Sequence, residues 1–453
     1  MTGDEMSSRL YPFLCEHLIL PLTDVVTRRF VYAKYRFLQK AQYWPRKRLE
    51  DYQNERLREV VEFSCRNVPY YRQLFAESGL RPEEIRTTGD LARLPILQKS
   101  MIRARRIDDF IHGDKSKLLL HRTSGTTGEQ GVFYMSKEAE GWIYAAQQMF
   151  FKWGGFSPGE RHLQTGAAFL RGFEKSVKDF VFNCHYVSAF DISDEELETV
   201  RGVLLKKRIK VLVGYASSLN SIASHVRARN EVIPLRSILS LGETLYPHYR
   251  ETIESAFGCR VTDTYGCGGE GVMVAGQCER QRYHVCMPLT FVEIVNGKGE
   301  RVPRGEAGRV VLTRLTPSPM PLIRYDVGDV SALSRDEGCE CGRGFALMEP
   351  IEGRISEIIT TPAGHRIASL LFAYILRMEQ SVALYQVLQE VRDRITIKVV
   401  PGPGFQETVL RRVESQILEA CKNDLKIGFE IVDDIPLGPG GKRRFVVSTV
   451  PFQ

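Results

Sequence analysis

Hydrophobic residues in the first hundred positions recur at the spacing of helices. Between residues 49 and 63, Leu57 and Val60 lie on one side of a helical projection, with polar residues between them. Pro69 interrupts this pattern, and a second short helix is expected after it. The pattern therefore predicts a helical N-terminal region over residues 1–100.

From about residue 115, short apolar runs alternate with amphipathic segments. Three runs of strand length end at glycine or at Tyr-Gly, namely residues 209–213, 238–241 and 260–264. Between the last two, Pro247 suits the first turn of a helix and Gly258 its end. Strand, helix and strand at this spacing predict a wound α/β core.

The predicted core spans residues 101–353. In wound α/β sheets, ligands gather at the carboxyl ends of the strands. The loops that start at Gly214, Gly242 and Gly266 all follow predicted strands. We therefore expect these three loops to share one site.

The last hundred residues have a pattern of their own. Residues 394–400 alternate apolar and polar side chains, residues 406–422 carry an apolar helical face, and residues 429–432 form another strand-like run. Together they predict a small α+β domain over residues 354–453, which follows a β-rich stretch at 288–350.

Composition is that of an ordinary globular chain, with 43% apolar and 26% charged residues and no internal repeat. The most apolar N-terminal stretch, residues 10–22, is broken by charge and by prolines, so neither a transmembrane segment nor a signal peptide is expected. The ten cysteines are scattered over 453 residues, without the short spacing of a secreted framework, which predicts a cytoplasmic location.

Basic residues cluster early although the net charge is only +7. The cluster consists of Arg28, Arg29, Lys34, Arg36, Lys40, Arg46, Lys47 and Arg48. A solvated helix face is the favoured interpretation, and attachment of the amphipathic N-terminus to a membrane surface stays open. No nucleic-acid partner is expected, because the aromatic residues and fold motifs of such proteins are lacking.

A loop rich in glycine and hydroxyl side chains follows the apolar run at residues 118–120. Its sequence is Thr123-Ser124-Gly125-Thr126-Thr127-Gly128. Backbone N–H groups without bulky side chains around them, together with hydroxyls, form a concavity suited to polyphosphate. The Gly-Lys-Ser/Thr ending of a Walker P-loop is lacking, and the alternative is a polar surface loop.

Four further motifs follow this loop. They are Tyr265-Gly266-Cys267-Gly268-Gly269-Glu270, Arg324-Tyr325-Asp326-Val327-Gly328-Asp329, Gly353-Arg354-Ile355-Ser356-Glu357 and Gly441-Lys442. In this order, the five motifs resemble those of the adenylate-forming superfamily, which contains acyl-CoA synthetases and nonribosomal adenylation domains. Val68-Pro69-Tyr70-Tyr71 and the Cys-x-Cys-Gly-Arg stretch at 339–343 are similar to the phenylacetate–CoA ligase branch and its capsule-biosynthesis relatives.

The resemblance covers residues from about 45 to 447 and implies a fold and a reaction. The fold is α/β: a large N-terminal adenylate-forming domain with a helical lead-in, wound core and β-rich subdomain, and a small C-terminal α+β domain that rotates about a hinge at Ser356. The reaction joins ATP and a carboxylic acid, aromatic or small, into an acyl-adenylate with Mg²⁺. Coenzyme A then accepts the acyl group. A homodimer fits this branch.

The resemblance also implies roles at the nucleotide. Asp329 accepts hydrogen bonds from both ribose hydroxyls, as a carboxylate can. Tyr265 with Gly266, and the Gly242-Glu243 turn, flank adenine.

Other residues are expected to contact the phosphates and Mg²⁺. By the same resemblance, the loop from Ser124 to Gly128 holds the β- and γ-phosphates, and Glu270 binds Mg²⁺, because hard cations prefer carboxylate oxygen. Arg354 contacts ribose or phosphate, and Lys442 bridges carboxylate and α-phosphate oxygens. Glu270, Arg354 and Lys442 are the catalytic candidates.

Several positions depart from the family pattern. Glu129 and Gln130 stand where most members carry a lysine after the phosphate loop. Glu270 is preceded by one extra residue, Asp326 replaces a basic residue, and Ser356 occupies a hinge position that is often Asp or Lys. These changes alter the charge expected around the triphosphate.

Cys278, His284, Cys339 and Cys341 form a second candidate site, with Cys286 as a reserve ligand. A Cys₃His set suits structural Zn²⁺, and similar positions in this family branch can hold zinc. The alternative is a set of ordinary buried cysteines with a hydrogen-bonded histidine.

Tyr215, His185 and Phe169 are candidates for the acyl pocket. Two alternatives to acid–CoA ligation stay open. One is an amide- or ester-forming ligase, in natural-product or polysaccharide biosynthesis, with an amine or hydroxyl acceptor. The other is a nucleotide-binding module without turnover on the same scaffold.

Overall fold

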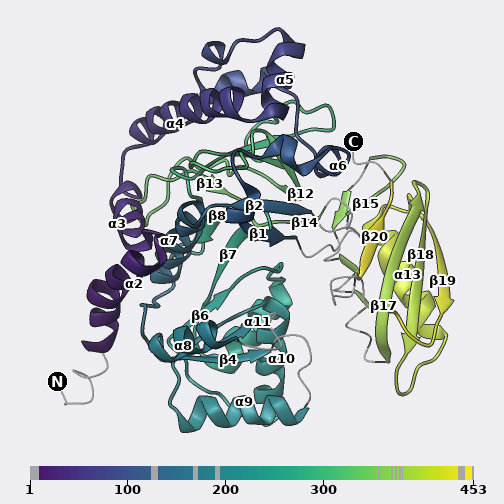
Figure 1. The fold of residues 1–453 in the computed structure, drawn as a ribbon. Helices are drawn as coiled ribbons and strands as arrows, with labels where there is room; N and C mark the ends of the chain where they lie inside the picture. Colours follow the sequence, from purple (N-terminus) through teal and green to yellow (C-terminus); the bar gives the residue numbers. More distant parts are fainter. Residues whose placement is uncertain are drawn as a thin grey trace.

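A computed structural model describes residues 10–123, 131–166, 172–188, 194–354, 358–364, 366–368, 371–372, 375–376, 379, 381–436 and 444–450. Figure 1 shows helices at the N-terminal end, sheets in the middle of the chain and a C-terminal module to one side. Within the described residues, no helix is both long and apolar enough to cross a bilayer.

The N-terminal region is helical, in agreement with its pattern. Its segments are the π-helical turn η1 (Cys15–Ile19), α2 (Leu20–Thr27), α3 (Val31–Ala41), α4 (Arg46–Asn67), α5 (Pro69–Ser78), η2 (Pro82–Glu84), η3 (Thr88–Arg93), α6 (Lys99–Arg103), η4 (Ile107–Phe110) and η5 (Lys115–Lys117). Helix α4 buries Leu57, Val60 and Val61 in the largest hydrophobic core. Pro69 begins α5, where its missing N–H costs no helical hydrogen bond.

The central sheet has the strand order β13-β9-β8-β7-β6-β5-β3-β4. The strands are β3 (His162–Gly166), β4 (Cys184–Ser188), β5 (Val211–Gly214), β6 (Ser237–Ser240), β7 (Val261–Cys267), β8 (Val272–Gln277), β9 (Tyr283–Val285) and β13 (Leu347–Met348). Strands β3 to β7 pair in parallel, whereas β7, β8, β9 and β13 are antiparallel. The parallel half is the wound part expected from the sequence.

Helices accompany these strands: α7 (Lys137–Trp153), α8 (Phe173–Val181), α9 (Asp194–Lys206), α10 (Ala216–Arg227) and α11 (Pro247–Phe257). Gly258 ends α11 in the left-handed conformation, with φ of 65°, which glycine adopts without strain. Apolar faces of α9, α10 and α11 share a core with the parallel strands.

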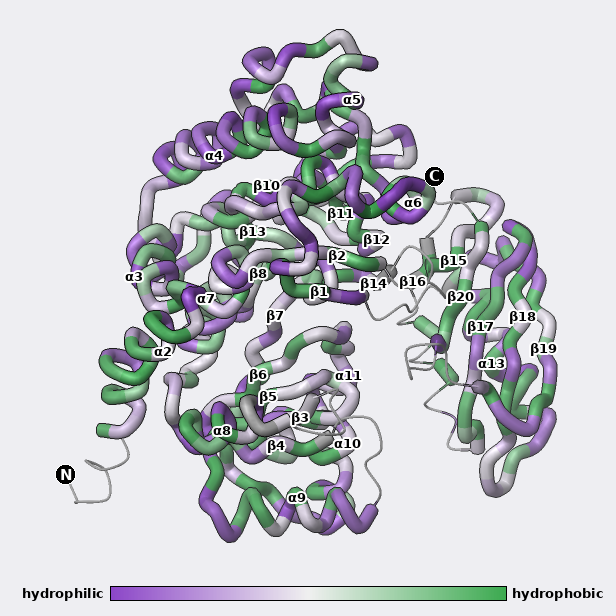
Figure 2. The backbone as a smooth tube through the Cα atoms, in the orientation of Figure 1, coloured by the Kyte–Doolittle hydropathy of each residue, from purple (hydrophilic) through white to green (hydrophobic). Residues whose placement is uncertain are grey.

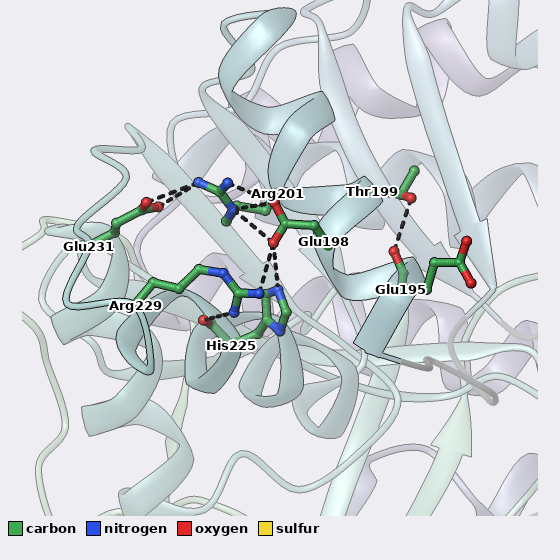
Figure 3. A network of polar contacts seen from close by, with 7 residues as sticks. All are labelled: Glu195, Glu198, Thr199, Arg201, His225, Arg229 and Glu231. Atoms are coloured by element: carbon green, nitrogen blue, oxygen red, sulfur yellow. Dashed lines mark hydrogen bonds and ion pairs between the residues drawn. The ribbon is translucent and has the colours of Figure 1, made fainter.

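Helices α9 and α10 are also joined by the polar network of Figure 3. Arg201 contacts Glu198 at 2.7 Å and Glu231 at 2.8 Å, and Glu198 also accepts from Arg229 at 3.0 Å. His225 Nε2 lies 3.1 Å from Glu198 Oε2. Glu198 is therefore the centre of the network.

Strand β7 is longer than the sequence pattern predicts. The expected strand stops at Thr264, but β7 continues through Tyr265 and Gly266 to Cys267. Its parallel pairing with β6 reaches Asp263, and antiparallel pairing with β8 takes over from Thr264. Tyr265 and Gly266 therefore belong to a strand and not to a loop, because β8 supplies hydrogen-bond partners that the local sequence does not reveal.

A second sheet has the order β10-β11-β12-β14, with β10 (Thr290–Val295), β11 (Gly308–Arg314), β12 (Tyr325–Ser331) and β14 (Gly353–Arg354). A separate antiparallel pair joins β1 (Leu119–Arg122) to β2 (Val132–Met135). The N-terminal helices, β2 and both sheets contribute to one core, in which Phe133 and Tyr325 are fully buried.

The C-terminal module begins after β14. It contains β15 (Ile358–Thr360), β16 (Arg366–Ala368), β17 (Val382–Val391), β18 (Arg394–Pro401), α13 (Thr408–Ala420), β19 (Lys426–Ile431) and β20 (Val446–Ser448). Its main sheet has the order β19-β18-β17-β20. Val413 and Ile417 of α13 pack with Ile395 and Ile397 of β18 in a core of its own.

Candidate active site and metal cluster

The carboxyl ends of β5, β6 and β7 meet at one edge of the parallel sheet, since these strands are direct parallel neighbours. After β6, Gly242 turns with φ of 70°, and a side chain there would lie 2.7 Å from the ring of Tyr215. Tyr215 stands at the start of α10, directly after β5. The first two loops that the sequence assigned to one site are thus in contact.

Glu243 links the same two loops. Its Oε2 accepts hydrogen bonds from the backbone N–H of Ser217 at 3.0 Å and from the Ser217 hydroxyl at 2.6 Å. Because the Glu243 carboxylate lies against the first turn of α10, it also interacts favourably with the dipole of that helix. Glu243 therefore fixes the shape of the Gly242-Glu243 turn. Since its side chain is bonded to Ser217, the backbone of the turn is the part that can contact a ligand.

Tyr265 joins the central sheet to the second sheet. Its hydroxyl donates to Asp329 Oδ2 at 2.7 Å, and burial, followed by the charge of Asp329, raises the pKa of this phenol well above its ordinary value. Asp329 in β12 is the register partner of Arg354 in β14. The structure thus joins three of the sequence-predicted nucleotide residues, Tyr265 to Asp329 through their side chains and Asp329 to Arg354 through backbone pairing.

Glu270 is buried in a cluster of polar groups. Its Oε1 accepts from the Tyr325 hydroxyl at 3.1 Å and lies 3.3 Å from Lys99 Nζ, while the guanidinium of Arg314 contacts the Glu270 backbone carbonyl. Burial lowers the pKa of Arg314 to about 10, so this group stays cationic at neutral pH. The cluster holds the Glu270 carboxylate in one place.

Lys99 is a residue that the sequence analysis missed. It begins α6, two residues after Leu97. The Leu97 N–H donates to the Arg324 carbonyl at 2.9 Å, and the Leu97 carbonyl accepts from the Asp326 N–H at 3.0 Å. A side chain at Gly131 would approach the Lys99 stem to 3.3 Å. Lys99 therefore lies between Glu270 and Gly131, the residue that precedes β2, and no motif in the sequence marks it.

Thr123 and Gly131 close the base of that loop. Thr123 donates its N–H to the Gly131 carbonyl at 3.0 Å, and the Gly131 N–H donates to Thr123 Oγ1 at 2.7 Å. Gly269 approaches so closely that a side chain there would lie 2.6 Å from Thr123 Cα. The glycine that precedes Glu270 is therefore required by contact between two of the five motifs.

Asp326, one of the departures from the family pattern, has a local partner. Its Oδ2 accepts from Arg309 at 2.8 Å and its Oδ1 from the Gly328 N–H at 2.9 Å. Burial raises the pKa of this carboxyl above its ordinary value. Its charge is thus balanced within the second sheet.

Of the acyl-pocket candidates, Tyr215 stands directly after β5 and His185 lies on β4. His185 occupies the edge strand β4, where its Nδ1 lies 3.4 Å from Lys207 Nζ. The next residue, Tyr186, points to the other face, because side chains alternate along a strand. A side chain at Gly166 would lie 2.6 Å from the Tyr186 hydroxyl. Burial raises the pKa of Tyr215 above its ordinary value, and the nearby Glu243 and Tyr186 raise it further.

Some predicted site residues lie outside the described residues. They are Ser124 to Gly128, the departures Glu129 and Gln130, Phe169, Ser356 and Lys442, and of Arg354 only the backbone is described.

The predicted Cys–His cluster is assembled in the structure. The ligand atoms of Cys278, His284, Cys339 and Cys341 all lie within 4.8 Å of one another. Cys278 Sγ is 3.8 Å from Cys339 Sγ, and Cys341 Sγ is 3.4 Å from His284 Nε2. Tetrahedral Zn²⁺ with Zn–S bonds of about 2.3 Å separates its sulfur ligands by about 3.8 Å, so the cluster fits this ion.

The surroundings suit a metal that binds neutral imidazole. Burial, with the charge of Arg343, lowers the pKa of His284 to about 4, which keeps the ring neutral. Cys286 is fully buried and does not belong to the group. All ten cysteines are described, and none forms a disulfide.

Known proteins resemble this chain along nearly its whole length. The CapK C-terminal domain family matches residues 359–449. The phenylacetate–coenzyme A ligase of Thermus thermophilus is 27% identical, with 83% of this chain and 87% of the relative covered. Protein CapK of Staphylococcus aureus is 22% identical over 97% of this chain and 98% of the relative.

The fold has a solved counterpart. The crystal structure of a 2-hydroxyisobutyryl-CoA ligase, in the postadenylation state with R3-HIB-AMP, aligns with a TM-score of 0.72 at 19% identity, covering 90% of this chain and 91% of that one. The expected α/β fold with a small C-terminal domain is confirmed. The chain thus has the fold of adenylate-forming ligases. Its sequence is similar to those of the phenylacetate–CoA ligases and of CapK.

Proposed function

We propose that this chain activates a carboxylic acid with ATP, forming an acyl-adenylate and pyrophosphate, and then transfers the acyl group to coenzyme A. The proposal rests on one observation: motifs that are far apart in the sequence lie close together in the structure. Asp329 is bonded to Tyr265 and adjacent to Arg354, and Glu270 lies beside Lys99 at the base of the loop at 124–130.

The chemistry of adenylation explains these residue types. A carboxylate oxygen bonds to the α-phosphorus while the bond to the pyrophosphate oxygen breaks, and negative charge gathers on the phosphate oxygens. Cations and N–H donors placed there in advance stabilise that charge. We assign this role to Lys99 and Lys442, and to the backbone of residues 124–128.

Lys99 would replace the lysine that most relatives carry after the phosphate loop. Its ammonium group is held by Glu270 at 3.3 Å, and its stem passes Gly131 at the end of that loop. Mg²⁺ brought by ATP would neutralise phosphate charge, and the buried Glu270 carboxylate is the oxygen ligand suited to hold it. Asp329, oriented by the Tyr265 hydroxyl, would accept from the ribose.

We further propose that the Cys–His cluster holds structural Zn²⁺. Four protein ligands close the coordination shell, so the ion would fix the loop at 339–341 against β8 and β9 and take no part in the reaction. The unbridged cysteines fit a reducing compartment such as the cytoplasm.

The test is pyrophosphate release by the purified chain with ATP and Mg²⁺ across aryl, fatty and amino acids. Each acid is assayed alone, with coenzyme A and with hydroxylamine. Release that needs one acid class, and product formation that needs coenzyme A, support the proposal. Turnover with hydroxylamine but not with coenzyme A would instead favour an amide- or ester-forming ligase.

Lys442→Ala separates an enzyme from a nucleotide-binding module. The variant is expected to lose pyrophosphate release nearly completely while ATP binding, measured by calorimetry, stays close to that of the unmodified chain. Arg411→Ala, on the exposed surface of α13, is the control and is expected to change neither quantity. Unchanged pyrophosphate release by Lys442→Ala would contradict the assignment.

A further inference from the structure

The first helical segment exposes a stripe of large apolar side chains. The chain is helical from residue 10 through η1 to the end of α2. This apolar stripe consists of Phe13, Leu14, Leu18, Leu22, Val25 and Val26. The exposed fractions of these side chains run from 37% for Leu14 to 83% for Val26. Figure 2 shows α2 at the edge of the molecule, with hydrophobic colour along its turns. Exposed apolar surface of this extent marks an interaction site.

The opposite face of the same segment anchors it. Cys15 and Leu20 are buried, and the Tyr11 hydroxyl donates to the Val181 carbonyl of α8 at 2.7 Å. A side chain at Gly159 would overlap Cys15 Sγ, so the segment sits tightly on the body of the protein. Leu14, Leu18, Leu22 and Val26 are four residues apart, which keeps the stripe on the outer side.

Within residues 10–49, the charges that face outward have one sign. Between residues 10 and 49, the acidic residues are Glu16 and Asp24. Glu16 accepts from Tyr35 at 3.2 Å and lies 3.3 Å from Lys152, while Asp24 accepts from the backbone N–H groups of Val31 and Tyr32 at 2.7 Å each. Both carboxylates are therefore used inside the protein.

The outward charges of that stretch are cations. Arg28 ends α2, and Arg36 and Lys40 follow on α3, all exposed. The neighbouring helix α8 adds the exposed side chains of Val177 and Phe180. An apolar helical face beside exposed cations matches an anionic lipid surface, into which such helices insert their apolar side.

From these observations we propose that residues 10–40 form a docking surface for an anionic lipid bilayer, with the stripe in the acyl-chain boundary and Arg28, Arg36 and Lys40 at the lipid phosphates. A second copy of the chain fits less well. A two-fold interface buries the same surface of both copies, so it would gather six of these cations in one contact region. The proposal is independent of which acid the site activates.

Vesicle flotation of the full chain tests it. The chain is expected to float with vesicles of phosphatidylcholine and phosphatidylglycerol, less with phosphatidylcholine alone, and less at high salt. Leu14→Glu with Leu18→Glu and Leu22→Glu is expected to lower the partition coefficient by more than about tenfold, because the apolar contacts are lost. Arg28→Ser, Arg36→Ser and Lys40→Ser are each expected to lower the partition coefficient by roughly fivefold, because each removes one charge.

A matched control carries Val391→Glu and Ile431→Glu, which replace exposed apolar side chains of the C-terminal module, and it is expected to float like the unmodified chain. Thermal melting and pyrophosphate release check that each variant folds. In addition, Leu18→Trp fluorescence is expected to be quenched by brominated lipid. Failure of the unmodified chain to float with either vesicle, or equal flotation of the triple glutamate variant, would overturn the proposal. So would a dimer, detected by light scattering, that the triple variant dissociates while vesicle binding is absent from both.

Discussion

At the scale of single residues, Lys99 is the position where charge and contact matter most. Its Nζ lies 3.3 Å from Glu270, and its stem passes close to Gly131. Lys99→Ala is expected to lower kcat/KM for ATP by roughly 100-fold in pyrophosphate release, because one preorganised cation at the phosphates is lost. Lys99→Arg should recover part of the activity.

The control for this change is Lys117→Ala. That side chain is 82% exposed and lies 3.6 Å from Asp114, away from Glu270. It should leave kcat/KM unchanged. If Lys99→Ala had the kinetics of the unmodified chain, Lys99 would be no more than a partner that keeps Glu270 buried.

At the scale of elements, the network between α9 and α10 predicts a dependence of stability on pH. Hydrogen bonds from Arg201 and then from His225 lower the pKa of Glu198 to about 2. A carboxyl whose pKa is lower in the folded state stabilises that state above its unfolded pKa, and the contribution is lost as pH falls toward the folded value. The contribution of Glu198 should therefore disappear between about pH 4.5 and about pH 2.

Glu198→Gln tests this expectation. The variant should melt at a lower temperature than the unmodified chain at about pH 7, and the difference should shrink as pH falls below about 4.5. Glu195→Gln, on the same helix, is the control, because Glu195 contributes its backbone carbonyl to the network of Figure 3. A melting difference that is the same at every pH would mean that Glu198 stabilises the helices by packing and not by its charge.

At the scale of the whole molecule, the Cys–His cluster connects distant parts of the N-terminal domain. Its ligands come from β9, from the residue after β8 and from the loop before β13. The same loop continues to Gly344, whose N–H donates to the Gln42 carbonyl at 2.8 Å, next to α3. An ion at the cluster would therefore hold sheet, loop and N-terminal helices together.

The prediction is one zinc ion for each chain, measured by mass spectrometry of metals after purification. Cys339→Ser and Cys341→Ser should each lower the zinc content, and removal of zinc by a chelator should lower Tm by more than about 5 °C. Cys259→Ser, outside the cluster, should keep both zinc and Tm. A zinc content near zero in the unmodified chain would leave the four residues as buried thiols and a neutral imidazole.

Much of the fold could be predicted from the sequence because it depends on local periodicity. The apolar face of α4 and the alternation of β18 are properties of the chain, and the structure buries both sets of side chains. The motifs around Tyr265, Glu270 and Asp329 carried the resemblance to adenylate-forming enzymes, and the fold agrees with that resemblance. The four residues of the Cys–His cluster were also singled out in the sequence, by their chemistry together with the family resemblance.

Other features were decided only by tertiary structure. The continuation of β7 through Tyr265 depends on β8, and Lys99 has no motif of its own, so folding alone brings it to Glu270. His185 and Tyr186 differ by one position, and the alternation of side chains along β4 sends them to opposite faces of the sheet. The stripe on η1 and α2 is amphipathic in sequence, but only packing decides that its apolar side faces out. Hydrophobic periodicity is a local property of the sequence, whereas the burial of a side chain depends on which distant residues pack against it.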